Sequence, residues 1–491
     1  MAGLDATCCC EARLSARFGV LGRRTERVVR GMATLSTSIR QNTATPGFAV
    51  AARNAAVSGF GAMVVGVFEI VGAVVQWAGK SHSWIFFFLA LKPLIDLTWR
   101  WSFFRFSGQS VNTQAIVGLS VLMLNGFAVL KNEAWRRLPR RVTLMLAFAS
   151  LSVVFSPSSW GANELLRLLA GTTFFYTAGP LLADAKQFDR FSKVFLLAMT
   201  VPVVLSYFQW AGVLPYEYWD WLDGESVNRA SGTYPTPLSM SFFLYYAFPL
   251  ALSIAGGKVQ GTQAKAGALV FLVLASGALA LGNHRTAYII VALQVFMWLA
   301  MTSGRKAVLV FLAVLSLVVV LSFGWLQTLS APIGDALSGK DDMENGQFLR
   351  GRGFQWLLFL NSYASSGPFH WVIGNGASTI AGYDPEDTEI DSVEPHNDYI
   401  RILHAYGIVG LLLYLSTLAL FLKRSIRLLR SAEEFPRRLA QIMLLAIVAI
   451  LIQSVVMEPM RYPTGVWYLF AIGSALFCVK AGPARTEGSP A

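Results

Sequence analysis

The sequence predicts an all-α fold, a polytopic bundle of about twelve transmembrane helices, and two observations support this class. Hydrophobic residues make up 55% of the 491 residues and charged residues only 14%, whereas about a quarter of the residues in soluble domains are charged. Apolar runs of roughly twenty residues, enough to cross a bilayer, also recur along nearly the whole chain. Because lipid offers the backbone no hydrogen-bonding partner and the alternating pattern of a membrane barrel is absent, these runs are expected to be helices.

Thirteen apolar runs are candidate spans, and one of them is weak. They begin near residues 57, 83, 113, 142, 162, 194, 238, 266, 286, 307, 408, 439 and 464. The run from residue 83 carries Lys92 and Asp96, and a charge near the centre of a spanning helix costs about 2.5 to 3.5 kcal/mol on insertion scales. The number of spans near the N-terminus therefore stays open.

The net charge of +12 is compatible with nucleic-acid binding, but the positions of the basic residues argue against it. They occupy short links between apolar runs, as the positive-inside rule predicts for cytoplasmic loops. If every intervening run crosses, one side of the membrane holds the basic clusters at 131–141, 258–265, 305–306 and 423–438. We expect that side to be cytoplasmic and expect membrane lipids, not nucleic acid, as the surroundings.

The expected organisation is one membrane domain with a single large external insertion. Residues 1–55 form an N-terminal cytoplasmic tail with a disordered composition, in which Met32 is an alternative start, and residues 481–491 form a second cytoplasmic tail. Transmembrane helices occupy 56–325 and 407–480, and residues 326–406 form a periplasmic loop. The four cysteines lie in the N-terminal tail and the last apolar run, so no external disulfide framework is proposed.

Three links on the side opposite the basic clusters carry unusual residues. The first link, residues 214–237, is rich in aromatic residues, which usually lie at the headgroup level. The second link, residues 282–286, is a tight Gly-Asn-His-Arg-Thr turn. The third link is the insertion itself, which is too long for a plain connection. Within it, residues 354–363 have the spacing of an amphipathic helix, and residues 374–376 indicate a turn.

Arginines stand at the helix ends of these links. Arg229 follows the aromatic half of the first link, Arg285 closes the second, and Arg350 and Arg352 precede the amphipathic helix of the third. A guanidinium offers a rigid fork of donors that matches phosphate oxygens, so two arginines facing one cleft are suited to hold a diphosphate. The alternative interpretation of Arg285 alone is a side chain that reaches from a helix end to the interface.

His396 is the candidate general base of the third link. It stands where the chain re-enters the membrane, and an unperturbed pKa near 6.5 suits proton abstraction at neutral pH. Glu394 precedes it by two residues and is placed to orient the imidazole or to neutralise an arginine. Asn397, Asp398 and Tyr399 follow as polar neighbours that can fix its tautomer, whereas we interpret His370 and His404 as structural.

Six acidic residues precede or adjoin this histidine, at 384, 386, 387, 389, 391 and 394. They lack the calcium-loop pattern with its central glycine, and a solvated face explains them better than a metal site. No metal and no cofactor is therefore expected.

Four segments resemble the O-antigen ligase and polymerase superfamily of membrane glycosyltransferases. They are residues 229–237 (Arg-Ala-Ser-Gly-Thr-Tyr-Pro-Thr-Pro), the Gly-Asn-His-Arg-Thr-Ala turn, the large external loop, and residues 395–413, which begin Pro-His-Asn-Asp-Tyr. The resemblance covers roughly residues 110–480. It departs from the family pattern at His284, where a serine is common, and at Ala405, where an acidic residue is common.

The resemblance implies a metal-independent, inverting transfer at the periplasmic face of a bacterial inner membrane, as in lipopolysaccharide biosynthesis. The donor is a polyprenyl-diphosphate-linked glycan and the acceptor a glycan or lipid hydroxyl. Arg229 and Arg285 would hold the diphosphate and His396 would activate the acceptor. The expected substrate-binding residues around them are Arg350, Arg352, Glu394, Asn397, Tyr399 and His284.

Three other functions remain open at the level of sequence. A repeat-unit polymerase of the same superfamily differs from a ligase only in its acceptor. A transporter of lipid-linked sugars would carry charged residues within its spans, and Glu69, Asp96 and Arg167 keep this alternative open. A scaffold of an envelope complex without catalytic activity predicts no effect when His396 is lost.

Overall fold

The computed structural model describes residues 83–302 apart from 101, 107–108, 132–138, 156–158, 217, 223–224 and 258–259, together with residues 309, 312, 352–376 and 394–480. All of these belong to one compact unit, Val75–Ala491. The expected helix near residue 57, both tails, Arg350 and the acidic residues before Glu394 lie outside the described residues, as does most of the expected helix near residue 307.

Helices dominate the described residues, and most begin close to where the apolar runs begin, whereas the helices that start at Ala185 and Asp398 begin well before the expected starts near 194 and 408. The longer ones are α3 (Ser83–Asp96), α4 (Thr113–Lys131), α5 (Arg140–Phe155), α6 (Ser159–Thr177), α8 (Ala185–Trp210), α9 (Pro237–Gly256), α10 (Thr262–Leu281), α11 (Arg285–Thr302), α16 (Asp398–Leu429), α17 (Glu434–Val456) and α18 (Pro463–Cys478). Four short helices join or cap them, namely α7 (Gly179–Leu182), α14 (Arg352–Ser365), α15 (Pro368–Ile373) and the 3₁₀ turn η4 (Pro459–Arg461). An all-α membrane fold is confirmed, and α14 confirms the amphipathic helix of the third link.

Five helices within the described ranges, α8, α9, α10, α16 and α17, are long and apolar enough to cross a membrane. Large apolar side chains also cover the exterior, including Leu119 on α4, Val154 on α5 and Val273 on α10, which are 54%, 72% and 72% exposed. Such a surface is stable in lipid and unstable in water. The total of about twelve spans stays a prediction.

Two small antiparallel hairpins were not predicted. Strands β1 (Ser102–Phe106) and β2 (Gln109–Asn112) connect α3 to α4, and β3 (Tyr218–Leu222) pairs with β4 (Glu225–Arg229) inside the first link. The alternating aromatic residues of β3 favour a strand, and the intervening Asp-Gly pair is typical of two-residue hairpin loops. Interpreting the first link only as a connection missed this local signal.

Helix α9 lies at the centre of the bundle, with almost every residue buried between α8, α10, α11, α17 and α18. Its polar groups are paired, because unpaired ones are costly in lipid. Tyr245 donates a hydrogen bond to Gln453 Oε1 at 2.8 Å, and Tyr246 donates to the Gly465 carbonyl at 2.7 Å. These bonds fix the ends of α17 and α18 that border the candidate site.

Helix α16 is kinked at Gly407, whose φ of 63° is left-handed. The expected span near residue 408 is the part after this kink, and the helix itself starts earlier, at Asp398. A Cβ on Gly407 would lie 2.4 Å from the Val372 carbonyl oxygen, and one on Gly374 would lie 2.3 Å from the Ala405 carbonyl oxygen. Glycine at both positions therefore lets α15 approach the first segment of α16 closely.

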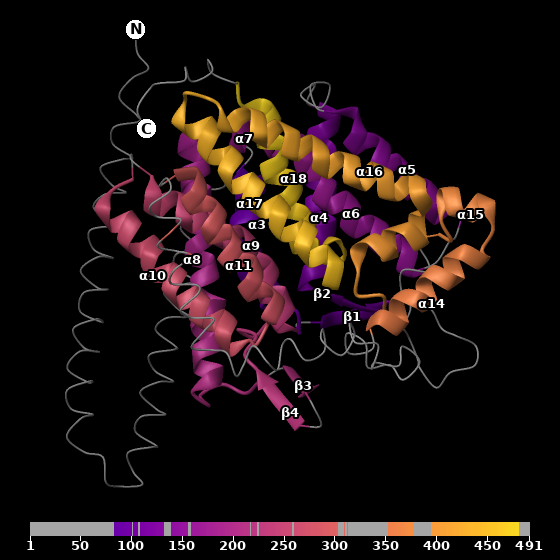
Figure 1. Cartoon of the computed structure of the whole chain (residues 1–491), viewed down its shortest axis with the longest axis horizontal. Coiled ribbons are helices and arrows are strands. Elements are labelled where there is room, and N and C mark those ends of the chain that lie inside the picture. Colours follow the sequence, from indigo (N-terminus) through magenta and orange to yellow (C-terminus); the bar gives the residue numbers. More distant parts are fainter. Residues whose placement is uncertain are drawn as a thin grey trace. The chain divides into compact units, whose positions relative to one another are not determined.

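The three links share one end of the bundle. Figure 1 shows both hairpins and α14 at its lower end, while α7 and the junction between α16 and α17 lie at the upper end. That junction carries the basic residues Arg427, Arg430, Arg437 and Arg438. This basic cluster therefore lies at the opposite end of the bundle from the three links, and the side of the membrane that each end faces stays a prediction.

Candidate active site

The turn after Arg229 is fixed against α8. Arg229 ends strand β4 opposite Tyr218. The backbone N–H groups of Ser231 and Gly232 both donate to Gln209 Oε1 at 2.9 Å. A Cβ on Gly232 would lie 2.3 Å from the Pro202 carbonyl oxygen, and the φ of this residue is 62°, so only glycine fits here. Arg229 therefore projects from a rigid support.

The second link lies directly beside this turn. The N–H of Ala230 donates to the Leu281 carbonyl at 3.2 Å, and a Cβ on Gly282 would lie 3.1 Å from the Ala230 carbonyl oxygen. The backbones that carry Arg229 and Arg285 are consequently held together. Arg285 is the first residue of α11, and its side chain lies outside the described part of the structure.

His284 connects these two links to the third. Burial, together with the charges of Arg229 and Arg352, lowers the pKa of His284 from 6.5 to about 4. Its Nδ1 atom is buried and has no hydrogen-bond partner among the described residues. Arg229, His284 and Arg352, which come from three separate links, are therefore near one another, and the lowered pKa leaves the His284 imidazole neutral at pH 7.

Contacts with two elements hold the backbone on either side of His396. The preceding Pro395 carbonyl accepts a 2.7 Å hydrogen bond from Trp356 Nε1 on α14. The N–H of Asp398 donates to the Met457 carbonyl at 3.2 Å, at the end of α17. Between them His396 has a left-handed φ of 44°, a conformation uncommon outside glycine.

Asn397 and Tyr399 position this segment by hydrogen bonds to the protein. Asn397 caps α16, since its side-chain oxygen accepts from the N–H groups of Tyr399 and Ile400, and its amide donates to the Val455 carbonyl at 2.9 Å. The Tyr399 hydroxyl donates to the Leu451 carbonyl at 2.8 Å. These bonds make both residues supports of the His396 backbone, and their expected contact with substrate stays a prediction.

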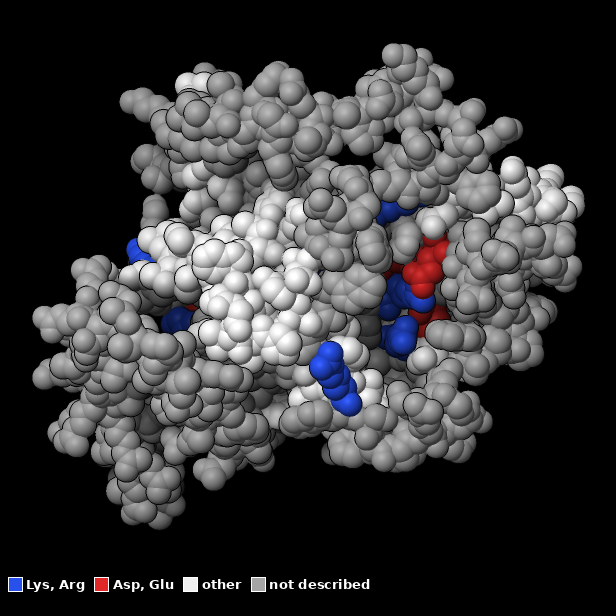
Figure 2. All heavy atoms as spheres, turned by 90° about the horizontal axis from the view of Figure 1, so that it is seen from below, with Lys and Arg blue, Asp and Glu red and all other residues white. Residues whose placement is uncertain are grey.

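Charges of both signs surround the His396 imidazole. Arg461 donates to Glu394 at 2.6 Å and to Glu458 at 3.2 Å. Burial lowers the pKa of His396; Glu458 and Glu394 oppose this effect, while Arg352 and Arg461 add to it. Arg352 therefore acts on both His284 and His396 and links the two halves of the site. Figure 2, which views the molecule from this end, shows basic and acidic side chains gathered in one hollow.

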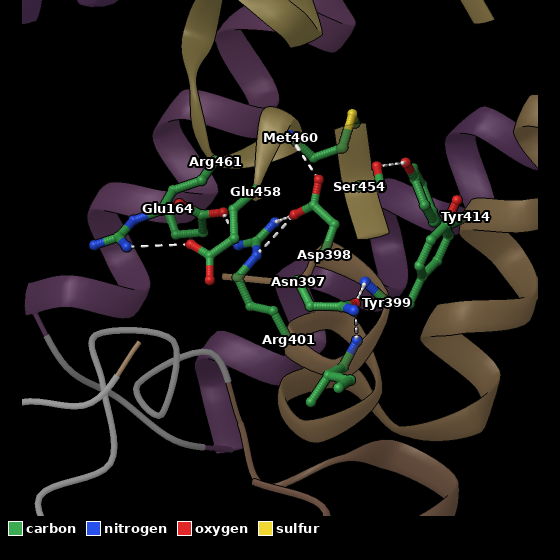
Figure 3. A network of polar contacts seen from close by, with 11 residues as sticks. Glu164, Asn397, Asp398, Tyr399, Arg401, Tyr414, Ser454, Glu458, Met460 and Arg461 are labelled. Atoms are coloured by element: carbon green, nitrogen blue, oxygen red, sulfur yellow. Dashed lines mark hydrogen bonds and ion pairs between the residues drawn. The ribbon is translucent and has the colours of Figure 1, made fainter. Parts of the chain in front are cut away.

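A buried ion cluster lies beneath His396 and was missed in the sequence. Arg401 donates to Asp398 Oδ1 at 3.0 and 2.8 Å and to Glu164 Oε1 on α6 at 2.8 Å (Figure 3). The other Asp398 oxygen accepts the Met460 N–H at 2.8 Å. Charged residues inside apolar runs were the available signal, but pairing residues 237 positions apart requires the fold.

Left-handed backbone conformations mark the same three links. Across the described residues, Thr233, Asn283 and His396 are the non-glycine residues with positive φ, at 69°, 45° and 44°. Each lies in a different one of the three links. Such conformations cost free energy and cluster at functional sites, where the surroundings enforce them.

The other two histidines singled out have structural contacts, as predicted. His404 is 3% exposed and its Nε2 lies 3.2 Å from both Ser362 Oγ and Asn375 Nδ2. His370 Nδ1 lies 3.1 Å from the Gly374 carbonyl oxygen at the end of α15. Ala405, where the family pattern often has an acid, is buried, and its carbonyl accepts the Gly376 N–H at 3.0 Å.

A segment of the chain matches a known protein family. Residues 270–415 match the family model described as O-antigen ligase. The matched segment begins within α10 and ends within α16, so it contains the second link, α14 and His396, while Arg229 precedes it. No curated protein matches the chain.

Proposed function

We propose that this chain, a member of the O-antigen ligase and polymerase superfamily of membrane glycosyltransferases, transfers a glycan from a polyprenyl diphosphate to an acceptor hydroxyl. The observation that carries the proposal is the convergence of Arg229, His284, Arg352 and His396 at one end of the bundle. By the positive-inside rule this end faces the periplasm of a bacterial inner membrane. There the lipid tail of the donor stays in the bilayer while its sugar lies in water.

The reaction needs a base for the acceptor and positive charge for the leaving group. A ring nitrogen of His396 takes the proton of the acceptor hydroxyl as its oxygen attacks the anomeric carbon of the donor sugar. The bond from that carbon to the diphosphate oxygen breaks, and the oxygen leaves with the electron pair. Attack from the opposite face inverts the anomeric centre.

Guanidinium groups supply the positive charge in this scheme without a metal ion. Arg229 and Arg352 flank His284, and Arg285 begins the helix that follows it. Fixed donors of this kind stabilise the charge that develops on a departing diphosphate. His284 is neutral at pH 7 and contributes a hydrogen bond to the phosphate oxygens, in place of the serine common in the family.

Ligation is the form of transfer that we propose, with lipid A core as the acceptor, and repeat-unit polymerisation is the alternative. Transport has less support, because Asp96, one of the residues that favoured it, forms an ion pair with Lys92 and accepts a hydrogen bond from Thr464. This carboxylate is thus occupied within the bundle and does not line a path.

The experiment uses purified protein in lipid nanodiscs with a polyprenyl-diphosphate oligosaccharide and lipid A core. His396→Ala and Arg285→Ala should each abolish product, since they remove the base and a diphosphate ligand. The matched control is His370→Ala, which changes an exposed histidine on α15 and should retain activity. Gel analysis separates modified lipid A core from lengthened glycan. Full activity in both site variants would refute the assignment.

A further inference from the structure

Glu458 lies in a segment that is hydrogen-bonded to the His396 segment. It follows α17 and immediately precedes η4. The residues on either side of it make the contacts: the Met457 carbonyl accepts the Asp398 N–H, and the Met460 N–H donates to Asp398 Oδ2. Asn397 donates to Val455 in the same segment. These contacts hold the segment of Glu458 against the residues that directly follow His396, and Figure 3 shows Glu458 near Asp398 and Arg461.

The Glu458 carboxylate is buried, and only one of its two oxygens is hydrogen-bonded within the described residues. The residue is 3% exposed, and its Oε2 atom accepts from Arg461 at 3.2 Å. Its Oε1 atom is buried and has no hydrogen-bond partner among the described residues. A buried carboxylate oxygen without a partner is costly, which makes a purely structural role for this side chain a poor explanation.

Arg461 orients the Glu458 carboxylate, and Arg461 has a second acidic partner besides Glu458. The guanidinium also binds Glu394 at 2.6 Å, so it keeps an ion pair when the charge of Glu458 is removed. The side chain of Glu394 is 34% exposed, against 3% for Glu458. Of the two acids bound to Arg461, Glu458 is therefore the one whose charge is less screened by water.

The charged groups around His396 show that Glu458 favours the protonated form of its imidazole. Burial, Arg352 and Arg461 all disfavour the protonated imidazole, whereas Glu458 and Glu394 favour it. Among these four charged groups Glu458 has the largest influence on the pKa of His396. A base that must take up a proton among arginines requires such a counter-charge.

We propose that Glu458 is a positioning residue whose buried carboxylate stabilises the imidazolium formed when His396 takes the proton of the acceptor hydroxyl. The proton remains on His396 until it passes to water after transfer, and none is transferred to Glu458. Glu458 lies beyond residues 270–415, so the family match does not account for it. The inference rests on the proposed function for its catalytic consequence, but the coupling between the two side chains can be measured without substrate.

The first measurement is the pH dependence of His396 modification by diethyl pyrocarbonate, which attacks neutral imidazole, read by mass spectrometry of the full chain in nanodiscs. In Glu458→Gln the midpoint for His396 should fall by about one pH unit, because a neighbouring counter-charge is lost. Glu394→Gln should give a smaller fall, and Glu433→Gln, an exposed residue at the start of α17, should give none. An unchanged midpoint in Glu458→Gln overturns the inference.

The second measurement is the pH profile of glycan transfer with the same variants. Glu458→Gln should lower kcat at least about tenfold, leave KM for the donor unchanged, and move the acid limb of kcat/KM to lower pH. A fall in kcat without movement of that limb would mean a purely structural role and overturn the inference. If Glu458→Gln does not fold, Glu458→Asp is the second variant, because its shorter side chain keeps the carboxylate but moves it away from His396. The midpoint of His396 modification in Glu458→Asp must then fall measurably, by less than about one pH unit. Retained activity in His396→Ala would instead refute the proposed function, so the two failures are distinguishable.

Discussion

Replacement of Arg401 by methionine tests the buried ion cluster beneath the site. The guanidinium makes three hydrogen bonds, two to Asp398 and one to Glu164, and the residue is 3% exposed. Methionine has a similar length and no charge. The substitution therefore leaves two carboxylates in the bundle, of which Asp398 retains only the Met460 N–H and Glu164 loses the guanidinium.

The expected loss of stability is about 3 to 5 kcal/mol, the range found when one partner of a buried ion pair is removed. Three independent hydrogen bonds to charged groups, at about 1.5 to 3 kcal/mol each, would give a larger loss of stability. The loss is smaller here because one guanidinium makes all three bonds, and its removal also removes the free-energy cost of burying that charge. Adding Glu164→Gln to the Arg401→Met variant should recover part of the loss, because one of the two unpaired charges disappears.

The assay is equilibrium unfolding in mixed detergent and SDS micelles, followed by tryptophan fluorescence. The matched control is Arg427→Met, which changes an exposed arginine on the same helix and should alter stability by less than about 0.5 kcal/mol. A loss below about 1 kcal/mol in Arg401→Met, or no recovery in the double variant, would refute the reasoning that Arg401 compensates both carboxylates.

Two further substitutions test local backbone and pH effects. Gly407→Ala should destabilise by at least about 1 to 2 kcal/mol, because its φ is left-handed and its Cβ would lie 2.4 Å from the Val372 oxygen, whereas Gly118→Ala, with nothing within 4 Å, should not destabilise in the same unfolding assay. The folded-state pKa of His284 is about 4 and the unfolded value is 6.5, so acid between these values protonates the unfolded state first. Stability of the wild type should therefore fall over this range relative to His284→Asn, and parallel stability curves would contradict the neutral, buried imidazole.

The helices were predictable because each membrane-spanning segment carries its own apolar run, which can be recognised in the sequence without knowing how the segments pack. Expected starts near 113, 142, 162, 238 and 266 lie within four residues of the observed starts of α4, α5, α6, α9 and α10. The start of α16 was placed too late because its first turn contains Asp398 and Arg401, whose charges conceal a buried helix. The hairpins were missed because a membrane interpretation gave no weight to period-two patterns in short links.

The candidate site was predictable in part, for a different reason. Links that leave the same end of a bundle must lie near one another, so sidedness alone brings Arg229, the second link and His396 to one region. It does not tell which polar side chains also hold the protein backbone. Asn397 and Tyr399 were assigned to substrate from their position in a motif; that role stays a prediction, and the structure adds their hydrogen bonds to Val455 and Leu451 of α17.

The sequence by itself determined that the chain is a helical membrane protein with arginines and a histidine in three links, since composition, run length and charge placement are properties of separate segments. Only the tertiary structure decided which charges are paired. Arg401 meets Glu164 across 237 positions, and Arg461 of η4 pairs with Glu394 beside His396. These pairings depend on how helices pack, because a buried charge is stable only where another element supplies its partner.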